Sequence, residues 1–249
     1  MSHVVGVAGS FNFLNDIKSD LDQDGILAAV HNRQTAKLFD WLMTSFSYQG
    51  ISDRVARQYI ERNGQLSWDS VAAGLSNKPC CSRLRSHWQF DKCRYDKLSR
   101  TCSEPELIAE CPLPQPSLRN GRLNQMGYSL FLFIRDVASG DMVGWIDRQL
   151  AVGAVSAHMG SAATTDLEER LIAPLRYIFG VSDKILKMSL STLLIGASLD
   201  RPVWLEVGKS MIVVDSLVHN FLHRTGILSD CGKPHAYGSG CYTGGGCAE

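Results

Sequence analysis

The residues best suited to chemistry in this sequence are its eight cysteines, which form two groups. In the first group Cys93, Cys102 and Cys111 are separated by eight residues each, and Cys80 or Cys81 is available as a fourth ligand. Four thiolates commonly bind zinc or an iron–sulfur cluster. The surrounding polar segment lacks helical periodicity, so little else would order it. We expect a metal site here, zinc before iron–sulfur; the alternative is a set of free buried thiols.

The second group lies in the Gly-rich tail at the C-terminal end of the sequence. It contains four sulfur or imidazole side chains: Cys231, His235, Cys241 and Cys247. These ligand types suit a tetrahedral zinc ion, although their spacing is irregular.

A third set of residues offers a different metal chemistry. Asp215, His219 and His223 recur at every fourth position, which would place a carboxylate and two imidazoles on one helix face. At about 1.5 Å of rise per residue the outer pair lies roughly 12 Å apart, so a single ion fits poorly. This alternative would make the protein a metalloenzyme with no DNA substrate.

The segment 83–100 combines positive charge with rings. It contains six Lys or Arg residues against two Asp, and His87, Trp88, Phe90 and Tyr95 are interleaved with them. Such a mixture suits phosphate contact and base stacking. A solvated loop surface is the alternative.

The overall composition is that of a globular protein, with 249 residues, 45% apolar residues and 25 basic against 25 acidic side chains. This balance excludes a disordered or collagen-like chain and gives no global attraction to nucleic acid. The least charged stretches of the second half, 149–165 and 188–199, fall short of the roughly 20 apolar residues that a membrane helix needs. The N-terminus lacks a basic region typical of secretion signals. We therefore expect a cytoplasmic monomer, nucleoid-associated if bacterial, with reduced or metal-bound thiols.

The elements that must position these residues are predicted to be helices, because apolar residues recur at helical spacing and alternating runs are scarce. The predicted helices cover 35–49, 51–59, 128–138, 165–179, 185–193 and 213–224. Thr165 and Glu168 are expected to form a capping box that opens one of them. The helix pair on either side of Gly180 is expected to form a tight helix-hairpin-helix unit. The fold class is all-α.

Changes in composition divide the chain into four expected regions. Residues 1–79 hold the N-terminal helices, and 80–125 form an irregular Cys-rich insertion. Residues 126–228 form the helical core with the hairpin, and 229–249 are the tail.

Three segments, in this order, resemble the helix-hairpin-helix DNA glycosylase superfamily, which includes endonuclease III and the 8-oxoguanine glycosylases. The first runs from Ser45 to Asp53 and contains Gln49; the second is Gly180-Val181-Ser182-Asp183-Lys184; the third begins with Val213-Val214-Asp215 and continues to Gly226. Together they cover about half of the chain.

The resemblance implies a two-lobed all-α fold and a DNA glycosylase of base excision repair. It implies that Lys184 is the nucleophile, that Asp215 is the carboxylate at the sugar, and that Gln49 fills the gap left by the extruded nucleotide. Gly180, Val181 and Ser182 would hold a DNA phosphate. Family analogy favours an oxidised base in double-stranded DNA and an additional AP-lyase activity, and none of this chemistry requires a cofactor. The alternative that keeps the fold is a non-catalytic DNA-binding protein.

The sequence departs from the family pattern at several positions. Ser182 replaces the second hairpin glycine, Asp183 adds a negative charge beside the expected phosphate, and Leu217 stands where many members have His. Only 34 residues follow Asp215, so we expect a reduced second lobe or a fragment.

Overall fold

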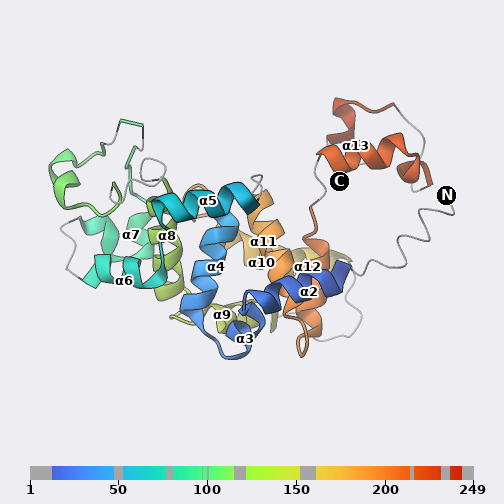
Figure 1. Ribbon diagram of the computed structural model, residues 1–249, viewed down its shortest axis with the longest axis horizontal. Helices are drawn as coiled ribbons and strands as arrows, with labels where there is room; N and C mark the ends of the chain where they lie inside the picture. Colours follow the sequence, from blue (N-terminus) through green and yellow to red (C-terminus); the bar gives the residue numbers. More distant parts are fainter. Residues whose placement is uncertain are drawn as a thin grey trace. The chain divides into compact units, whose positions relative to one another are not determined.

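The computed structural model of this chain is helical, as the sequence predicts (Figure 1). It describes residues 13–47, 53–76, 81–96, 98–99, 101–114, 122–151, 161–213, 216–230 and 236–242. Within these ranges there is no β-strand, and strand-type pairing is limited to one isolated bridge between Asp96 and Thr101. The all-α prediction is confirmed. No helix of the described ranges has both the length and the apolar character needed to cross a membrane.

The chain divides into two compact units, 1–211 and 212–249. The α-helices of the first unit are α2 (Phe13–Gln23), α3 (Ile26–His31), α4 (Thr35–Ser47), α5 (Asp53–Asn63), α6 (Trp68–Ser76), α7 (His87–Phe90), α8 (Arg122–Asp136), α9 (Met142–Ala151), α10 (Ser161–Leu175), α11 (Asp183–Gly196) and α12 (Pro202–Ser210). It also contains two short 3-10 helices, η1 (Ser82–Arg85) and η2 (Pro105–Glu110). The second unit contains α13 (Ser216–Arg224), η4 (Ile227–Asp230) and η5 (Ser239–Tyr242).

Helix α8 is buried on nearly all sides, because its sequence is apolar around the full helical turn. Leu130, Leu132, Phe133 and Ile134 are fully buried. The ring of Phe133 packs edge-on against Trp145 of α9 at 5.1 Å between centroids. Helices α4, α6 and α7 pack on other sides of α8, and α4 lies between α8 and α11 in Figure 1. Helix α8 is thus the centre of the first unit.

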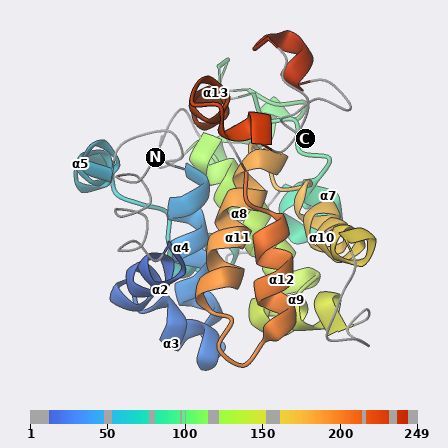
Figure 2. The ribbon, with the colours of Figure 1, turned by 90° about the vertical axis from the view of Figure 1, so that its right-hand side faces the viewer.

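Helix α11 packs most extensively against α12, and also contacts α2 and α4 (Figure 2). The backbones of α11 and α12 approach closely at Gly208 of α12. A Cβ added there would lie 2.9 Å from Ile195 Cγ1 and 3.1 Å from the backbone nitrogen of Ile195 in α11. The Ser191 hydroxyl donates a hydrogen bond of 2.8 Å to the Gly208 carbonyl at the same crossing. Only glycine allows this spacing without displacing α11.

Both boundaries of one predicted helix, 165–179, are wrong. Helix α10 begins at or before Ser161, so Thr165 lies inside it and the predicted capping box does not open the helix. The same helix ends at Leu175 rather than near Phe179, and residues 176–182 form the turn. The prediction extended too far because Ile178 continues the helical spacing of apolar residues, although it is buried in the turn and not in the helix.

The Cys-rich insertion is irregular, as expected, but short helical turns interrupt it and α8 already begins at Arg122. His87, at the start of α7, joins the insertion to α8: its ring packs against Phe133 at 5.5 Å, and its backbone N–H donates to Asp136 Oδ2 at 2.7 Å. Burial lowers the pKa of His87 below its ordinary value of 6.5, against the opposing effect of Asp136 and Asp91. The neutral imidazole therefore belongs to the folded state.

Substituting Gly208 by Ala is expected to destabilise the protein by about 1–3 kcal/mol, because the new methyl group overpacks the crossing of α11 and α12. The change is measured as a shift in the midpoint of urea unfolding. Gly238→Ala is the matched control, since a Cβ there meets no atom within 4 Å among the described residues. Equal stability of the two variants would contradict the close packing.

Acidification is expected to destabilise the folded chain through His87. Because the folded pKa is lowered, the unfolded chain binds the proton at higher pH, so this stability is present above about pH 6.5 and is lost below it. Between about pH 7.5 and about pH 5, the midpoint temperature of thermal unfolding should fall more steeply for the wild type than for His87→Phe. The exposed His31 serves as control through His31→Gln, which should keep the wild-type slope. Parallel slopes for wild type and His87→Phe would refute the assignment.

Candidate functional site

Residues 176–182 form the turn between α10 and α11, where the sequence predicts a helix-hairpin-helix unit. Gly180 adopts φ +78°, a left-handed conformation that favours glycine. Ser182 is extended and caps α11: its hydroxyl accepts from the Ile185 N–H at 3.5 Å, and its carbonyl accepts from the Leu186 N–H at 2.9 Å. The first backbone N–H groups of a helix have no intrahelical acceptor. The hairpin therefore presents N–H donors at the start of α11, next to a glycine that leaves room for close approach.

The serine that replaces the second hairpin glycine thus has a defined role. A glycine caps a helix without a side-chain hydrogen bond, whereas Ser182 adds one to the first turn of α11. The departure from the family pattern therefore stabilises the start of the helix.

The second departure, Asp183, is paired within the hairpin. Its carboxylate accepts from Arg176 Nε at 2.9 Å and forms an ion pair with Arg176 Nη2, also at 2.9 Å. Arg176 also binds both carboxylate oxygens of Glu169. Hydrogen bonds from Arg176 hold the pKa of Asp183 and of Glu169 below their ordinary values. The carboxylate of Asp183 is therefore engaged by Arg176 at the base of the hairpin.

Lys184 follows directly, in the first turn of α11, and its side chain is exposed. No ion pair of the described residues includes it, in contrast to Lys187 one turn later, which pairs with Glu168 at 2.7 Å. The amine of Lys184 is accessible beside the hairpin.

Two other residues implied by the resemblance lie outside the described residues. Gln49 follows the end of α4, and Asp215 precedes α13. Of the residues that the resemblance implies, the structure describes Lys184 and its neighbours Gly180, Val181 and Ser182, all in the first unit.

In the second unit, His219 and His223 pack on Tyr237, whose ring centroid lies 5.8 Å and 5.6 Å from theirs. Cys241 is buried, and its sulfur accepts from the Gly238 N–H at 3.4 Å. The other predicted tail ligands, Cys231, His235 and Cys247, lie outside the described residues.

The four described cysteines of the insertion line one small cavity of about 30 Å³. They come from four separate turns: Cys81 precedes η1, Cys93 follows α7, Cys102 follows the isolated bridge, and Cys111 follows η2. All four are free thiols. No three His, Cys, Asp or Glu side chains of the described residues are already arranged to hold a metal ion. The fourth described cysteine at this cavity is Cys81, and Cys80 lies outside the described residues.

Three of these sulfurs accept a hydrogen bond from the backbone two residues further along the chain. Glu104 N–H donates to Cys102 at 3.3 Å, Tyr95 N–H donates to Cys93, and Leu113 N–H donates to Cys111. Burial raises the pKa of Cys93 and raises that of Cys111 to about 11. The N–H donors lower the pKa of these two thiols, and the neighbouring thiols raise it. Each loop thus directs an N–H group at its own sulfur.

A surface groove of about 480 Å³ lies between the segment 81–111, which we call the cysteine loop, and the turn 176–182, which we call the hairpin. Its lining includes Arg94 and Tyr95 from the loop, Gln125 from α8, and Phe179 and Gly180 from the hairpin. The basic and aromatic composition of 83–100 pointed to Arg94 and Tyr95. Sequence reasoning missed Gln125 and Phe179, because nothing in their spacing shows that they border the loop.

Helix α8 holds both walls of this groove. The hydroxyl of Ser129 donates to the Tyr177 carbonyl at 3.3 Å and accepts from the Phe179 N–H at 3.4 Å. The fully buried Asn124 donates to the Leu113 carbonyl at 2.6 Å. Phe179 and Phe90 then pack edge-on at 5.4 Å between ring centroids.

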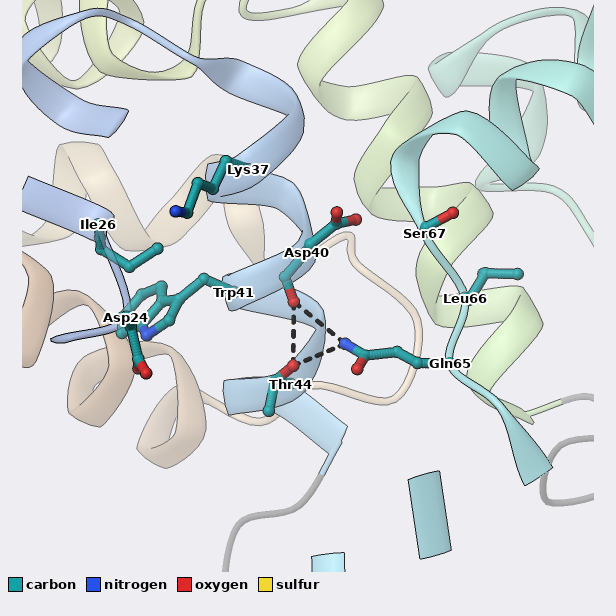
Figure 3. Close-up of a pocket in the computed structure, with 9 residues that line it drawn as sticks. All are labelled: Asp24, Ile26, Lys37, Asp40, Trp41, Thr44, Gln65, Leu66 and Ser67. Carbon is teal, nitrogen blue, oxygen red and sulfur yellow. Dashed lines mark hydrogen bonds between the residues drawn. The ribbon is translucent and has the colours of Figure 1, made fainter. Parts of the chain in front are cut away.

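A separate groove of about 630 Å³ lies along α4 (Figure 3). Its polar groups bind one another: Gln65 donates to the Asp40 carbonyl at 3.2 Å and to the Thr44 hydroxyl at 2.6 Å. The Asp40 carboxylate accepts from the Trp68 N–H at 2.8 Å, at the start of α6. Burial raises the pKa of Asp40. These groups hold the segment between α5 and α6 against α4.

Removing the Ser129 hydroxyl is expected to loosen the hairpin, because two backbone groups of the turn lose their partner. Ser129→Ala should cost about 1 kcal/mol of stability and speed amide hydrogen exchange at Phe179. The matched control is Ser76→Ala, which removes only a bond within α6. Unchanged exchange at Phe179 in Ser129→Ala would contradict this anchoring.

Comparisons with protein-family models, curated proteins and solved structures find no match to this chain.

Proposed function

We propose that this protein is a DNA glycosylase of the helix-hairpin-helix type that also cleaves the abasic site through Lys184. The observation that carries the proposal is the hairpin itself. A left-handed Gly180, a Ser182 cap and an exposed Lys184 follow one another at the start of α11. The three ordered segments that resemble the superfamily support the same conclusion.

The hairpin suits a phosphate group of the DNA backbone. The N–H groups at the start of α11 that Ser182 does not engage, together with the positive end of the α11 dipole, would bind its oxygens. Arg176 offsets the charge of Asp183, which would otherwise repel the phosphate. Arg94, exposed on the far side of the groove, would add a second cationic contact to the same strand.

The exposed amine of Lys184 becomes a nucleophile only after it loses a proton. Its lone pair then attacks C1′ as the N-glycosidic bond breaks, and the base leaves with the bonding electrons and is protonated. The sugar ring opens to a Schiff base between Nζ and C1′. Loss of a C2′ proton expels the 3′ phosphate, and water then releases Lys184.

A carboxylate near the sugar would stabilise the positive charge that develops as the base leaves. The resemblance assigns this role to Asp215. A lysine nucleophile favours an oxidised base as substrate, by analogy with the superfamily.

The test is borohydride trapping on labelled duplexes that contain 8-oxoguanine, thymine glycol, uracil or an abasic site. The wild type should form a covalent band with at least one of them, and Lys184→Gln should form none. Asp215→Asn should slow base release by about 10²- to 10³-fold. Lys209→Gln, which changes a lysine paired with Glu206 on α12, should trap like the wild type.

Two results would overturn the catalytic proposal. A band that persists in Lys184→Gln would exclude this lysine as the nucleophile. Duplex binding without any band or base release would identify a non-catalytic DNA-binding protein, and loss of duplex binding as well would remove the DNA function altogether.

A further inference from the structure

We propose that Cys81, Cys93, Cys102 and Cys111 bind one zinc ion as four thiolates, and that this ion holds the cysteine loop beside the hairpin. Tetrahedral coordination by four sulfurs at about 2.3 Å is a closed, structural arrangement.

The first observation is that the four cysteines line one cavity, although their side chains are not arranged around a common point. They come from turns spread over residues 81–111, where the regular structure of the described residues is limited to short helical turns and one bridge. Such a segment has few backbone hydrogen bonds to order it. All four cysteines nevertheless line the same cavity. A bound ion would cross-link the four turns at one point.

The second observation is the repeated N–H···S hydrogen bond from residue i+2, at Cys93, Cys102 and Cys111. Three independent loops share this local geometry, although their sequences differ. Backbone donors around metal-bound ligands orient them and compensate their charge.

The third observation is the charge around the cavity. One zinc ion with four thiolates carries a net charge of −2, which a buried site must offset. Arg83 and Arg94 line the cavity together with Glu104, which pairs with Arg83 Nη2 at 3.4 Å. The Nε of Arg83 is buried without a hydrogen-bond partner among the described residues, so this donor remains available to an anionic thiolate centre.

A single zinc ion needs no further atoms, because four thiolates at about 2.3 Å complete a closed tetrahedral site. An iron–sulfur cube adds four metal and four sulfide atoms between the same cysteines and holds them farther apart. The sulfurs must still turn toward a common point, and one staggered step about χ1 moves a cysteine sulfur by about 3 Å.

The position of the site gives the ion a role in the proposed function, on which this part of the inference rests. Cys93 is followed directly by Arg94 and Tyr95, which form one wall of the groove, and Gly180 of the hairpin lines the other. Fixing Cys93 therefore fixes Arg94 relative to the hairpin. Loss of the ion should weaken DNA binding without changing any residue that contacts DNA.

The test compares the metal content of the purified full chain with that of single variants. Cys81→Ser and Cys102→Ser should each contain one zinc equivalent less than the wild type. Cys80→Ser is the matched control, because it removes the adjacent thiol and should keep the wild-type zinc content. Any zinc held by the tail remains in every sample, so the difference reports this site alone.

A second measurement needs no substitution that could impair folding. Titration of the wild type with p-hydroxymercuribenzoate should release this zinc as thiols react. Cobalt in place of zinc should give the absorption of a tetrahedral thiolate complex, lost in Cys102→Ser. Iron and sulfide in the purified chain, or equal zinc in wild type and Cys102→Ser, would overturn the proposal.

Duplex binding is measured on the same samples. Weaker binding by Cys102→Ser than by Cys80→Ser would support the link between the ion and the hairpin. Equal binding, with zinc lost only from Cys102→Ser, would overturn that link and leave the zinc site intact. If the zinc-loaded wild type binds no DNA, the proposed function fails, while the metal analysis still decides the zinc site.

Discussion

The burial of α8 on nearly all sides is the constraint on which the first unit depends. A helix enclosed by protein must find partners for its polar side chains, since an unpaired buried group costs about 1–3 kcal/mol. The amide nitrogen of Asn124 and the hydroxyl of Ser129 meet this requirement by bonding to segments that are not helical: the end of the insertion and the turn before α11. Asp136 does the same with the backbone of α7. The apolar core and the two irregular segments are therefore coupled through α8.

This coupling explains why two distant parts of the sequence border one groove. The cysteine loop and the hairpin are separated by more than sixty residues, yet both are hydrogen-bonded to the same helix. The packing of Phe90 on Phe179 completes the contact. A rigid central helix can hold a functional turn and its neighbouring loop in fixed register, whereas either segment alone has little regular structure to define its position.

The charges around the hairpin are balanced locally. Arg176, Lys184 and Lys187 stand against Glu168, Glu169 and Asp183, and most of these groups are paired with one another. This agrees with the net charge of zero for the whole chain, which provides no long-range attraction to DNA. Recognition of a phosphate at this turn would therefore rest on directed N–H groups, Lys184 and Arg94 rather than on a broad basic surface.

The sequence by itself determined the helical class, the approximate extents of α4, α5 and α11, and the turn near Gly180, because helical spacing and a glycine at a helix end are local signals. It also identified the cysteines that line one cavity, apart from the choice between Cys80 and Cys81. The end of α10 was misplaced because Ile178 is buried in a turn, and burial alone does not distinguish a turn from a helix. Only the tertiary structure decided that Arg176 pairs with Asp183 and that Gln125, Phe179 and Arg94 border one groove. These contacts join residues through the packing around α8, and the spacing of residues along a chain carries no record of which surfaces such packing brings together.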